Sequence, residues 1–110
     1  MNKFYITTPI YYVNDEPHIG HAYTTILADV LGRIKKLQDF DVFFLTGTDE
    51  HGQKVQEAAK KRGVEPLDHV NEYVKRFESI WEKLNIEYND FIRTTENRHK
   101  DRVKDILIYL

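Results

Sequence analysis

The chain has 110 residues, of which 41% are hydrophobic and 31% are charged, and its formal net charge is −2. This balance is typical of one globular domain and excludes a disordered segment. A surface that grips a long nucleic acid unaided would carry a basic excess, which is absent. The sequence contains no cysteine, which excludes disulfides and thiolate-bound zinc. Without a membrane-length apolar run or a secretory signal, we expect a cytoplasmic protein with no membrane partner.

A strand, a loop and a helix are predicted first. Residues 4–8 are aromatic and β-branched, and Pro9 ends this predicted strand. Residues 10–17 form a predicted loop that contains the turn-forming pair Asn14-Asp15. From about Ile19, apolar residues recur at spacings of three and four, which predicts a helix with one apolar face. This face comprises Ile26, Leu27, Val30, Leu31, Ile34 and Leu37.

The middle of the chain predicts a buried strand and two helices. Residues 41–46 form a nearly continuous apolar run that Gly47 is expected to stop, which suits a strand in a parallel sheet covered by helices. A short helix is predicted over Gln53–Arg62, with Gly63 as its carboxy-terminal cap. A second helix follows Pro66, and its apolar stripe, which includes the lone tryptophan, is interpreted as core packing. The stripe comprises Leu67, Val70, Val74, Phe77, Trp81 and Leu84.

The last predicted elements are a short strand over residues 91–94 and a helix capped by Thr95. Strands that alternate with helices in this way indicate the α/β class. The apolar face of the last helix is expected to use Val103, Ile106, Leu107 and Leu110.

The turn His18-Ile19-Gly20-His21 lies where the first loop enters the first helix. A helix start offers unpaired N–H groups and a partial positive charge, which favour an anion. Two imidazoles three residues apart can lean over one pocket there, and Gly20 lets a planar ligand or a ribose approach the backbone. These donors suit a phosphoryl group that gains negative charge as it becomes five-coordinate. A metal site and a surface pair without function stay open as alternatives, although the zinc-protease histidine spacing is absent.

A second informative turn, residues 47–52, follows the buried strand. Ligands of open α/β sheets bind at the carboxyl ends of strands, so both turns are expected at that edge. Asp49 could hold an ammonium group there by a charge-assisted hydrogen bond. Glu50 is interpreted as a cap of the next helix. His51 is left undecided between packing and function.

Together these residues resemble the class I aminoacyl-tRNA synthetases. Residues 18–21 match the family's His-Ile-Gly-His signature without a mismatch. Residues 7–14, 44–52 and 91–95 are similar to the methionyl branch, so the resemblance covers most of the chain. It implies a Rossmann-type parallel sheet with flanking helices. Residues 1–110 would be the amino-terminal half of the catalytic, nucleotide-binding domain.

The resemblance also implies a function, that of a methionine–tRNA ligase fragment, and a role for each site residue. Methionine would react with ATP to give methionyl-adenylate, for transfer to tRNA(Met). His18 and His21 would be catalytic and bind ATP, as would Pro9 and Gly20. The amino acid would be held by Ile10, Tyr12 and Asp49, with the aromatic ring of Tyr12 against the polarizable thioether. The motif region comprises Tyr11, Tyr12, Val13, Asn14, Asp15, Glu16, Pro17, His18, Ile19, Gly20 and His21.

Further partners follow from the same resemblance. ATP would act as a substrate accompanied by Mg²⁺, and no zinc or other metal site is expected within this chain. The family's Lys-Met-Ser-Lys-Ser signature, connective domain and anticodon-binding domain are absent from these residues. Half of a doubly wound sheet would expose an edge strand and an apolar helix surface, which the second half would cover. Two alternatives stay open: an inactive folding or binding fragment, and a small nucleotidyltransferase with a His-x-Gly-His turn.

Overall fold

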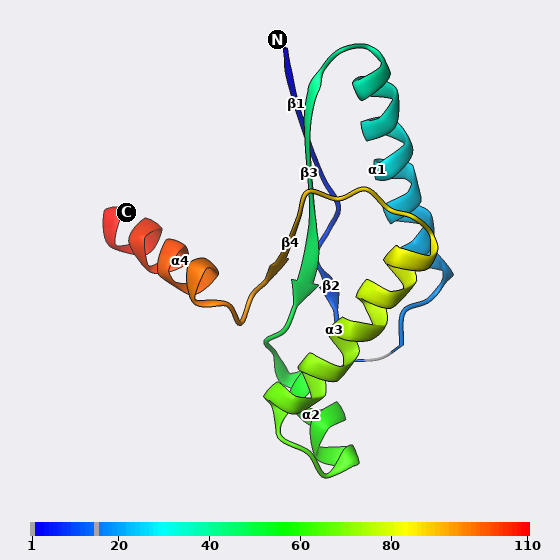
Figure 1. Cartoon of the computed structure of the whole chain (residues 1–110). Coiled ribbons are helices and arrows are strands. Elements are labelled where there is room, and N and C mark those ends of the chain that lie inside the picture. Colours follow the sequence, from blue (N-terminus) through cyan, green and yellow to red (C-terminus); the bar gives the residue numbers. More distant parts are fainter. Residues whose placement is uncertain (1, 15) are drawn as a thin grey trace.

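A computed structural model describes residues 2–14 and 16–110 of the chain (Figure 1). Asp15, which belongs to the predicted motif region and the predicted turn, lies outside the described residues. The elements are, in chain order, β1 (Lys3–Thr7), β2 (Tyr11–Tyr12), α1 (Ile19–Leu37), β3 (Asp41–Asp49), α2 (Gln53–Arg62), α3 (Pro66–Lys83), β4 (Asp90–Arg93) and α4 (Asn97–Tyr109).

Strand β3 is the centre of a parallel sheet. Leu45 of β3 pairs with Thr7 of β1 and also with Asp90 of β4, so these two strands lie on opposite edges of β3. Further along, Thr48 pairs with Tyr11 of β2 and with a residue of β4. Strands β1 and β2 therefore follow one another along one edge of β3. The parallel sheet with flanking helices confirms the predicted α/β class and Rossmann-type architecture.

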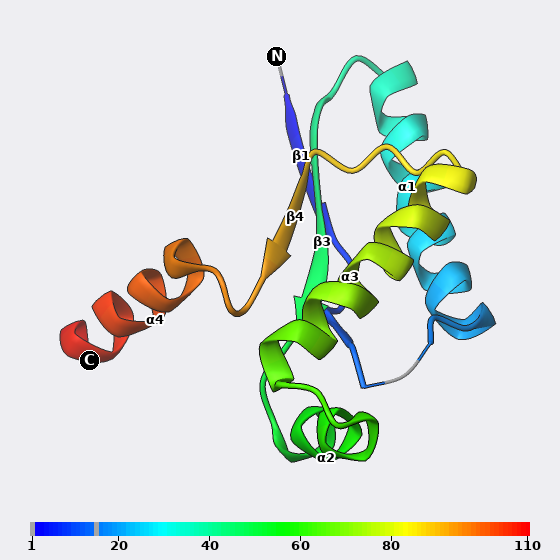
Figure 2. The ribbon, with the colours of Figure 1, turned by 60° about the horizontal axis from the view of Figure 1, so that its bottom comes forward.

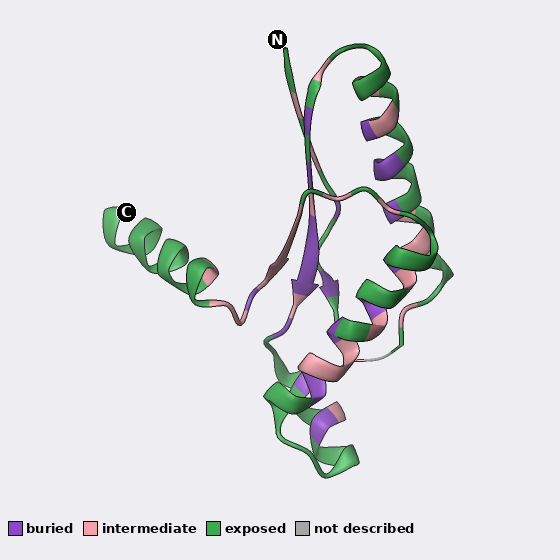
Figure 3. Cartoon of the chain, in the orientation of Figure 1, coloured by how far each residue is buried: buried purple, intermediate pink, exposed green. Residues whose placement is uncertain are grey.

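Helices α1 and α3 lie on the same side of the sheet, whereas α4 points away from it (Figures 1 and 2). The buried core lies where α3 crosses β2, the loop after β2 and α2. Burial is concentrated along β3 and the inner face of α3, as Figure 3 shows. Each fully buried large side chain contributes about 1.5 to 3 kcal/mol. The core cluster comprises Tyr11, Val13, Val55, Val70, Val74, Phe77 and Trp81.

The predicted core stripe of α3 is confirmed in its middle and wrong at its ends. Val70, Val74, Phe77 and Trp81 are each at most 2% exposed. The stripe ends are largely exposed, because the helix extends beyond the elements it packs on. The two exposed residues are Leu67 and Leu84.

The predicted helix over α1 is confirmed, but its predicted apolar face is exposed. The helix instead buries Thr25, Ala28, Asp29 and Gly32. The apolar face of α4 is exposed as well, and no residue of α4 is buried. Within residues 2–14 and 16–110, no helix is both long and apolar enough to cross a membrane. The exposed α1 residues are Ile26, Leu27, Val30, Leu31, Ile34 and Leu37, and those of α4 are Val103, Ile106, Leu107 and Leu110.

The open face of the sheet carries stacked aromatic rings. Tyr5 of β1 and Phe43 of β3 lie with ring centroids 5.9 Å apart, and both side chains are exposed. In contrast, Val42 and Phe44, the neighbours of Phe43 in β3, are buried on the face that the helices cover. The prediction that helices cover the strand over residues 41–46 is therefore correct for one face of the sheet and wrong for the other, because the helices of residues 2–14 and 16–110 cover only one face.

Several predicted boundaries differ from the structure. Residues 11–12 were expected in a loop but form β2, because they reach the end of β3 and pair with it. Thr95 does not cap α4: Glu96 is the N-cap residue, without a side-chain cap bond, and the Thr95 hydroxyl donates to Glu50 instead. Gly63 is confirmed as the cap of α2, with φ at 70° in the left-handed region.

Gly47 does not stop β3 but lies inside it, where the backbone of β4 approaches closely. A Cβ atom at Gly47 would collide with the carbonyl oxygen of Ile92. We therefore expect Gly47→Ala to lower the free energy of unfolding by about 1 to 3 kcal/mol, because backbone must move to make room. Urea unfolding would measure this change.

Gly32→Ala is the matched control, since its Cβ would lie 3.6 Å from Val42, an ordinary contact. In helix α1 that change should stabilise the chain by up to about 1 kcal/mol. Equal effects of the two substitutions would contradict the close approach at Gly47.

Candidate active site

Helix α1 begins with two histidines that cap each other. His18 is the N-cap residue, in an extended conformation, and its Nδ1 accepts the amide N–H of Gly20 at 3.1 Å. His21 Nδ1 accepts the amide N–H of His18, also at 3.1 Å. The two rings stack with centroids 3.9 Å apart. This is a capping box in which imidazoles replace the usual hydroxyl and carboxylate.

The capping box determines which ring nitrogens carry hydrogen. A nitrogen that accepts an amide N–H has no proton of its own, so the neutral rings of His18 and His21 carry hydrogen on Nε2. Burial lowers the pKa of His21 below its usual value, and the adjacent His18 ring lowers it further. His21 is therefore neutral at pH 7 and presents Nε2–H as a hydrogen-bond donor.

Gly20 makes room for the observed position of the His18 ring. A Cβ atom there would lie 2.9 Å from Cε1 of His18, closer than real Cβ contacts allow. The missing side chain lets the His18 ring fold over the first turn of α1. The His21 ring packs against Tyr11 and Phe77, whose ring centroids lie 4.8 and 5.2 Å from its own.

A cavity of about 380 Å³ opens in front of the two histidines. It brings together His18 and His21 with Ile10 and Tyr12, two of the residues predicted to hold the amino acid. Asp49 does not line this cavity but pairs with Tyr12 in the β2–β3 register. Pro9 and Gly20 are exposed beside it without lining it. The cavity is lined by Ile10, Tyr11, Tyr12, Asn14, Glu16, His18 and His21.

The rest of the motif region divides between core and surface. Tyr11 is buried, and its hydroxyl shares a hydrogen bond of 2.9 Å with Thr25. Val13 is fully buried, whereas Ile19 is 87% exposed. Pro17 is half-buried. The buried side chains of Tyr11 and Val13 thus anchor the loop of the motif region.

Glu50 is not a helix cap, which corrects the sequence prediction. The N-cap residue of α2 is Gly52, which makes no side-chain cap bond. The Glu50 carboxylate is instead fully buried and forms an ion pair with Arg93 at 2.8 Å. Burial alone would raise the pKa of Glu50, but hydrogen bonds from Arg93, Thr48 and Thr95 hold this pKa below its usual value. Glu50 is therefore ionised at pH 7.

His51 contacts the end of the neighbouring strand. Its Nε2 lies 3.2 Å from the carbonyl oxygen of Thr94, which places the ring proton on Nε2 in the neutral form. The residue also lines a cavity of about 220 Å³ together with Tyr12 and Lys54. His51 therefore packs against the chain and faces a cavity at the same time.

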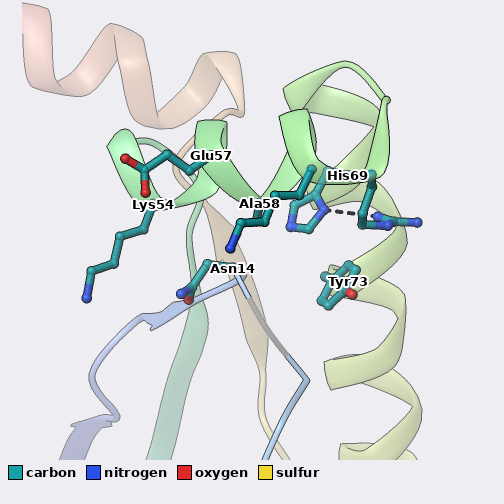
Figure 4. Close-up of a pocket in the computed structure, with 8 residues that line it drawn as sticks. Asn14, Lys54, Glu57, Ala58, His69 and Tyr73 are labelled. Atoms are coloured by element: carbon teal, nitrogen blue, oxygen red, sulfur yellow. Dashed lines mark hydrogen bonds between the residues drawn. The ribbon is translucent and has the colours of Figure 1, made fainter.

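A further cavity of about 490 Å³ lies between α2 and α3 and contains a histidine that the sequence prediction missed (Figure 4). His69 is 1% exposed. Its Nδ1 accepts from Arg62 at 3.0 Å, and its Nε2 donates to the carbonyl oxygen of Val13 at 2.9 Å. His69 thus fixes the loop before the His18 turn. Its position beside Val70 in the stripe of α3 was the only signal in the sequence.

Within residues 2–14 and 16–110, no three histidine, cysteine or carboxylate side chains gather closely enough to hold a metal ion. The cavity in front of the two histidines is lined by ring N–H donors and aromatic rings. Hydrogen-bond donors at a helix start are suited to a phosphorylated ligand.

Comparison with known proteins identifies the family of this chain. The family described as tRNA synthetases class I (M) matches residues 4–110. The methionine–tRNA ligase of Listeria monocytogenes is 55% identical over 105 residues, which are 96% of this chain and 16% of that protein. The Thermotoga maritima methionine–tRNA ligase is 54% identical over 105 residues, 96% of this chain and 17% of that protein. This chain thus spans about a sixth of the length of these relatives.

The fold is similar to a solved structure of Mycobacterium tuberculosis methionyl-tRNA synthetase in complex with methionyl-adenylate. The TM-score is 0.90 and the sequence identity 46%, over 92% of this chain and 20% of that one. Sequence and fold agree over nearly all of the residues present. The chain belongs to the methionyl-type class I tRNA synthetases.

Proposed function

We propose that this chain provides the ATP and methionine half-site of a methionine–tRNA ligase. The observation that carries this proposal is the cavity at the start of α1, which His18 and His21 share with Ile10 and Tyr12. The M. tuberculosis relative was solved with methionyl-adenylate, the product of joining these two substrates. In the proposed reaction, a carboxylate oxygen of methionine attacks the α-phosphorus of ATP. The bond from that phosphorus to the bridging oxygen breaks, and pyrophosphate leaves.

The two histidines are the proposed catalytic residues. Their Nε2–H groups would donate to phosphate oxygens and would bind more strongly as negative charge grows in the transition state. The N–H groups and dipole of the α1 start favour the same charge. Pro9 and Gly20 would border the nucleotide, and ATP would arrive with its Mg²⁺ as substrate.

The amino acid is proposed to bind beside the nucleotide. Asp49 would accept hydrogen bonds from the α-ammonium group, together with the backbone carbonyl of Ile10. The exposed ring of Tyr12 would contact the thioether of methionine. These roles use residues at the carboxyl end of β3 and of the neighbouring β2, where ligands of α/β sheets bind.

Residues 1–110 are proposed to be the amino-terminal part of the catalytic domain. The open sheet face with Tyr5 and Phe43, and the apolar face of α1, would be covered by the second half of that domain. Transfer to tRNA(Met), in this proposal, belongs to the longer enzyme. The same exposed surfaces favour the alternative that the chain alone is a binding fragment without turnover.

Methionine-dependent exchange of pyrophosphate into ATP tests the proposal. We expect exchange with methionine but not with leucine, and loss of exchange in the double variant His18→Ala with His21→Ala. Exchange equal to that of the double variant would reject catalysis by this half-site alone. Nucleotidyl transfer that needs no methionine would support the nucleotidyltransferase alternative instead.

A further inference from the structure

Two adjacent carboxylates at the end of β3 have opposite surroundings. The Glu50 side chain is 0% exposed and accepts from Arg93 Nε and Nη2, both at 2.8 Å. The hydroxyls of Thr48 and Thr95 also donate to it, at 2.5 and 2.8 Å. Asp49 is only half-buried, and residues 2–14 and 16–110 provide no hydrogen bond or ion pair to its carboxylate. One carboxylate is thus fully paired and its neighbour is available to a ligand.

The pairing of Glu50 ties three elements together. Arg93 ends β4, whose register partner in β3 is Thr48, two residues before Glu50. Arg93 Nη2 also donates to Asn71 of α3 at 2.7 Å. The Thr94 hydroxyl lies 2.8 Å from the Glu50 amide, which donates to it. Side chain and backbone of Glu50 are therefore both fixed, by a set of contacts that we term the Glu50–Arg93 clasp.

We propose that Glu50 and Arg93 are positioning residues for Asp49, an inference that rests on the proposed function. Successive side chains of an extended segment point in opposite directions, so fixing Glu50 inward turns Asp49 outward. The register partner of Asp49 is Tyr12, which lines the cavity in front of the histidines. The clasp thereby sets where an ammonium group can meet Asp49.

The clasp also controls charge at the strand end. Arg93 neutralises Glu50, so Asp49 remains as the carboxylate that attracts an ammonium group. In the variant Glu50→Gln, the guanidinium of Arg93 loses its anionic partner. It is then free to pair with Asp49 and to repel the ammonium group. Removing both charges in Glu50→Gln with Arg93→Gln eliminates this competition, and the two amides can hydrogen-bond each other.

Isothermal titration calorimetry of the chain tests this inference with three ligands. They are methionine, ATP and 4-(methylsulfanyl)butanoate, which is methionine without its ammonium group. In Glu50→Gln we expect the Kd for methionine to rise about tenfold. The Kd values for ATP and for the des-amino acid should change less than about twofold, since neither ligand has an ammonium group to lose. The double variant should recover most of the methionine affinity. The control is Asp90→Asn, which breaks the exposed ion pair between Asp90 of β4 and Arg98 of α4 and should change none of these values.

Each other outcome overturns a stated claim. If all three ligands weaken together in Glu50→Gln, or the double variant does not recover, the clasp is structural only. If Glu50→Gln does not fold by circular dichroism, Thr95→Val decides, since it removes one hydrogen bond to Glu50 without changing charge. An unchanged methionine Kd in that variant would also reject the inference. If the unaltered chain binds neither methionine nor ATP, the proposed function itself fails.

Discussion

His18→Asn is expected to keep α1 capped while lowering methionine-dependent pyrophosphate exchange by about 100-fold. The asparagine side chain ends where Nδ1 of His18 lies, so it can still accept the Gly20 amide, and asparagine is a preferred N-cap residue. It has no atom at the position of Nε2. The proposed donor to phosphate is therefore lost while the stability stays within about 0.5 kcal/mol of the original.

His18→Gln should show the opposite pattern. Its amide nitrogen can reach the position of Nε2 and donate there, so more of the exchange activity should remain than in the asparagine variant. Its longer side chain caps poorly, and the free energy of unfolding should fall by about 1 kcal/mol. Exchange rates and urea unfolding of both variants give the comparison. If asparagine retains more activity than glutamine, Nε2 is not the phosphate donor.

Arg93→Ala is expected to destabilise the chain by about 3 kcal/mol at pH 7, because it leaves the buried carboxylate of Glu50 without a counter-charge. The exposed pair of Asp90 with Arg98 is the control, and Asp90→Asn should cost less than about 1 kcal/mol. Denaturant unfolding measures both. If the two substitutions lower the free energy of unfolding equally, burial of Glu50 does not increase the contribution of its ion pair to stability.

The difference between Arg93→Ala and the original chain should depend on pH. The pKa of Glu50 is lowered in the folded state, below the usual value of about 4.3. Its contribution is therefore fully present above that value and is lost as the pH falls through the folded-state pKa. The two proteins should therefore differ in stability at pH 7, and their unfolding curves should converge as the pH falls below the folded-state pKa of Glu50. A constant difference would mean that Glu50 is not the group that Arg93 stabilises.

The local patterns predicted much of this fold. Apolar spacing located α1 and α3, Gly63 ended α2, and the His18 turn was expected at the start of α1. Each of these features depends on residues within one or two helical turns, so a short stretch of sequence is sufficient to specify it. The strand-end rule predicted that the His18 turn and the turn with Asp49 share one edge of the sheet, whereas the grouping of Ile10 and Tyr12 with the two histidines was implied only by the family resemblance.

What the sequence could not predict depends on distant partners. Glu50 looked like a helix cap because Arg93, its partner, lies 43 positions later in the chain. Gly47 looked like the end of a strand because the approach of Ile92 is visible only in three dimensions. The apolar stripe of α1 predicted a helix correctly but not its surroundings, since periodicity identifies a face and not what covers it.

The mutual cap of His18 and His21 restricts the chemistry open to them. A neutral imidazole accepts a proton only through its unprotonated nitrogen, and in both rings that nitrogen is Nδ1, already engaged by an amide of the first turn. Neither ring can act as a general base without opening the helix start. Attack by a methionine carboxylate requires no such proton transfer, because the nucleophile is already ionised at pH 7. The structure of this turn therefore leaves the two histidines as hydrogen-bond donors and prevents them from acting as general bases.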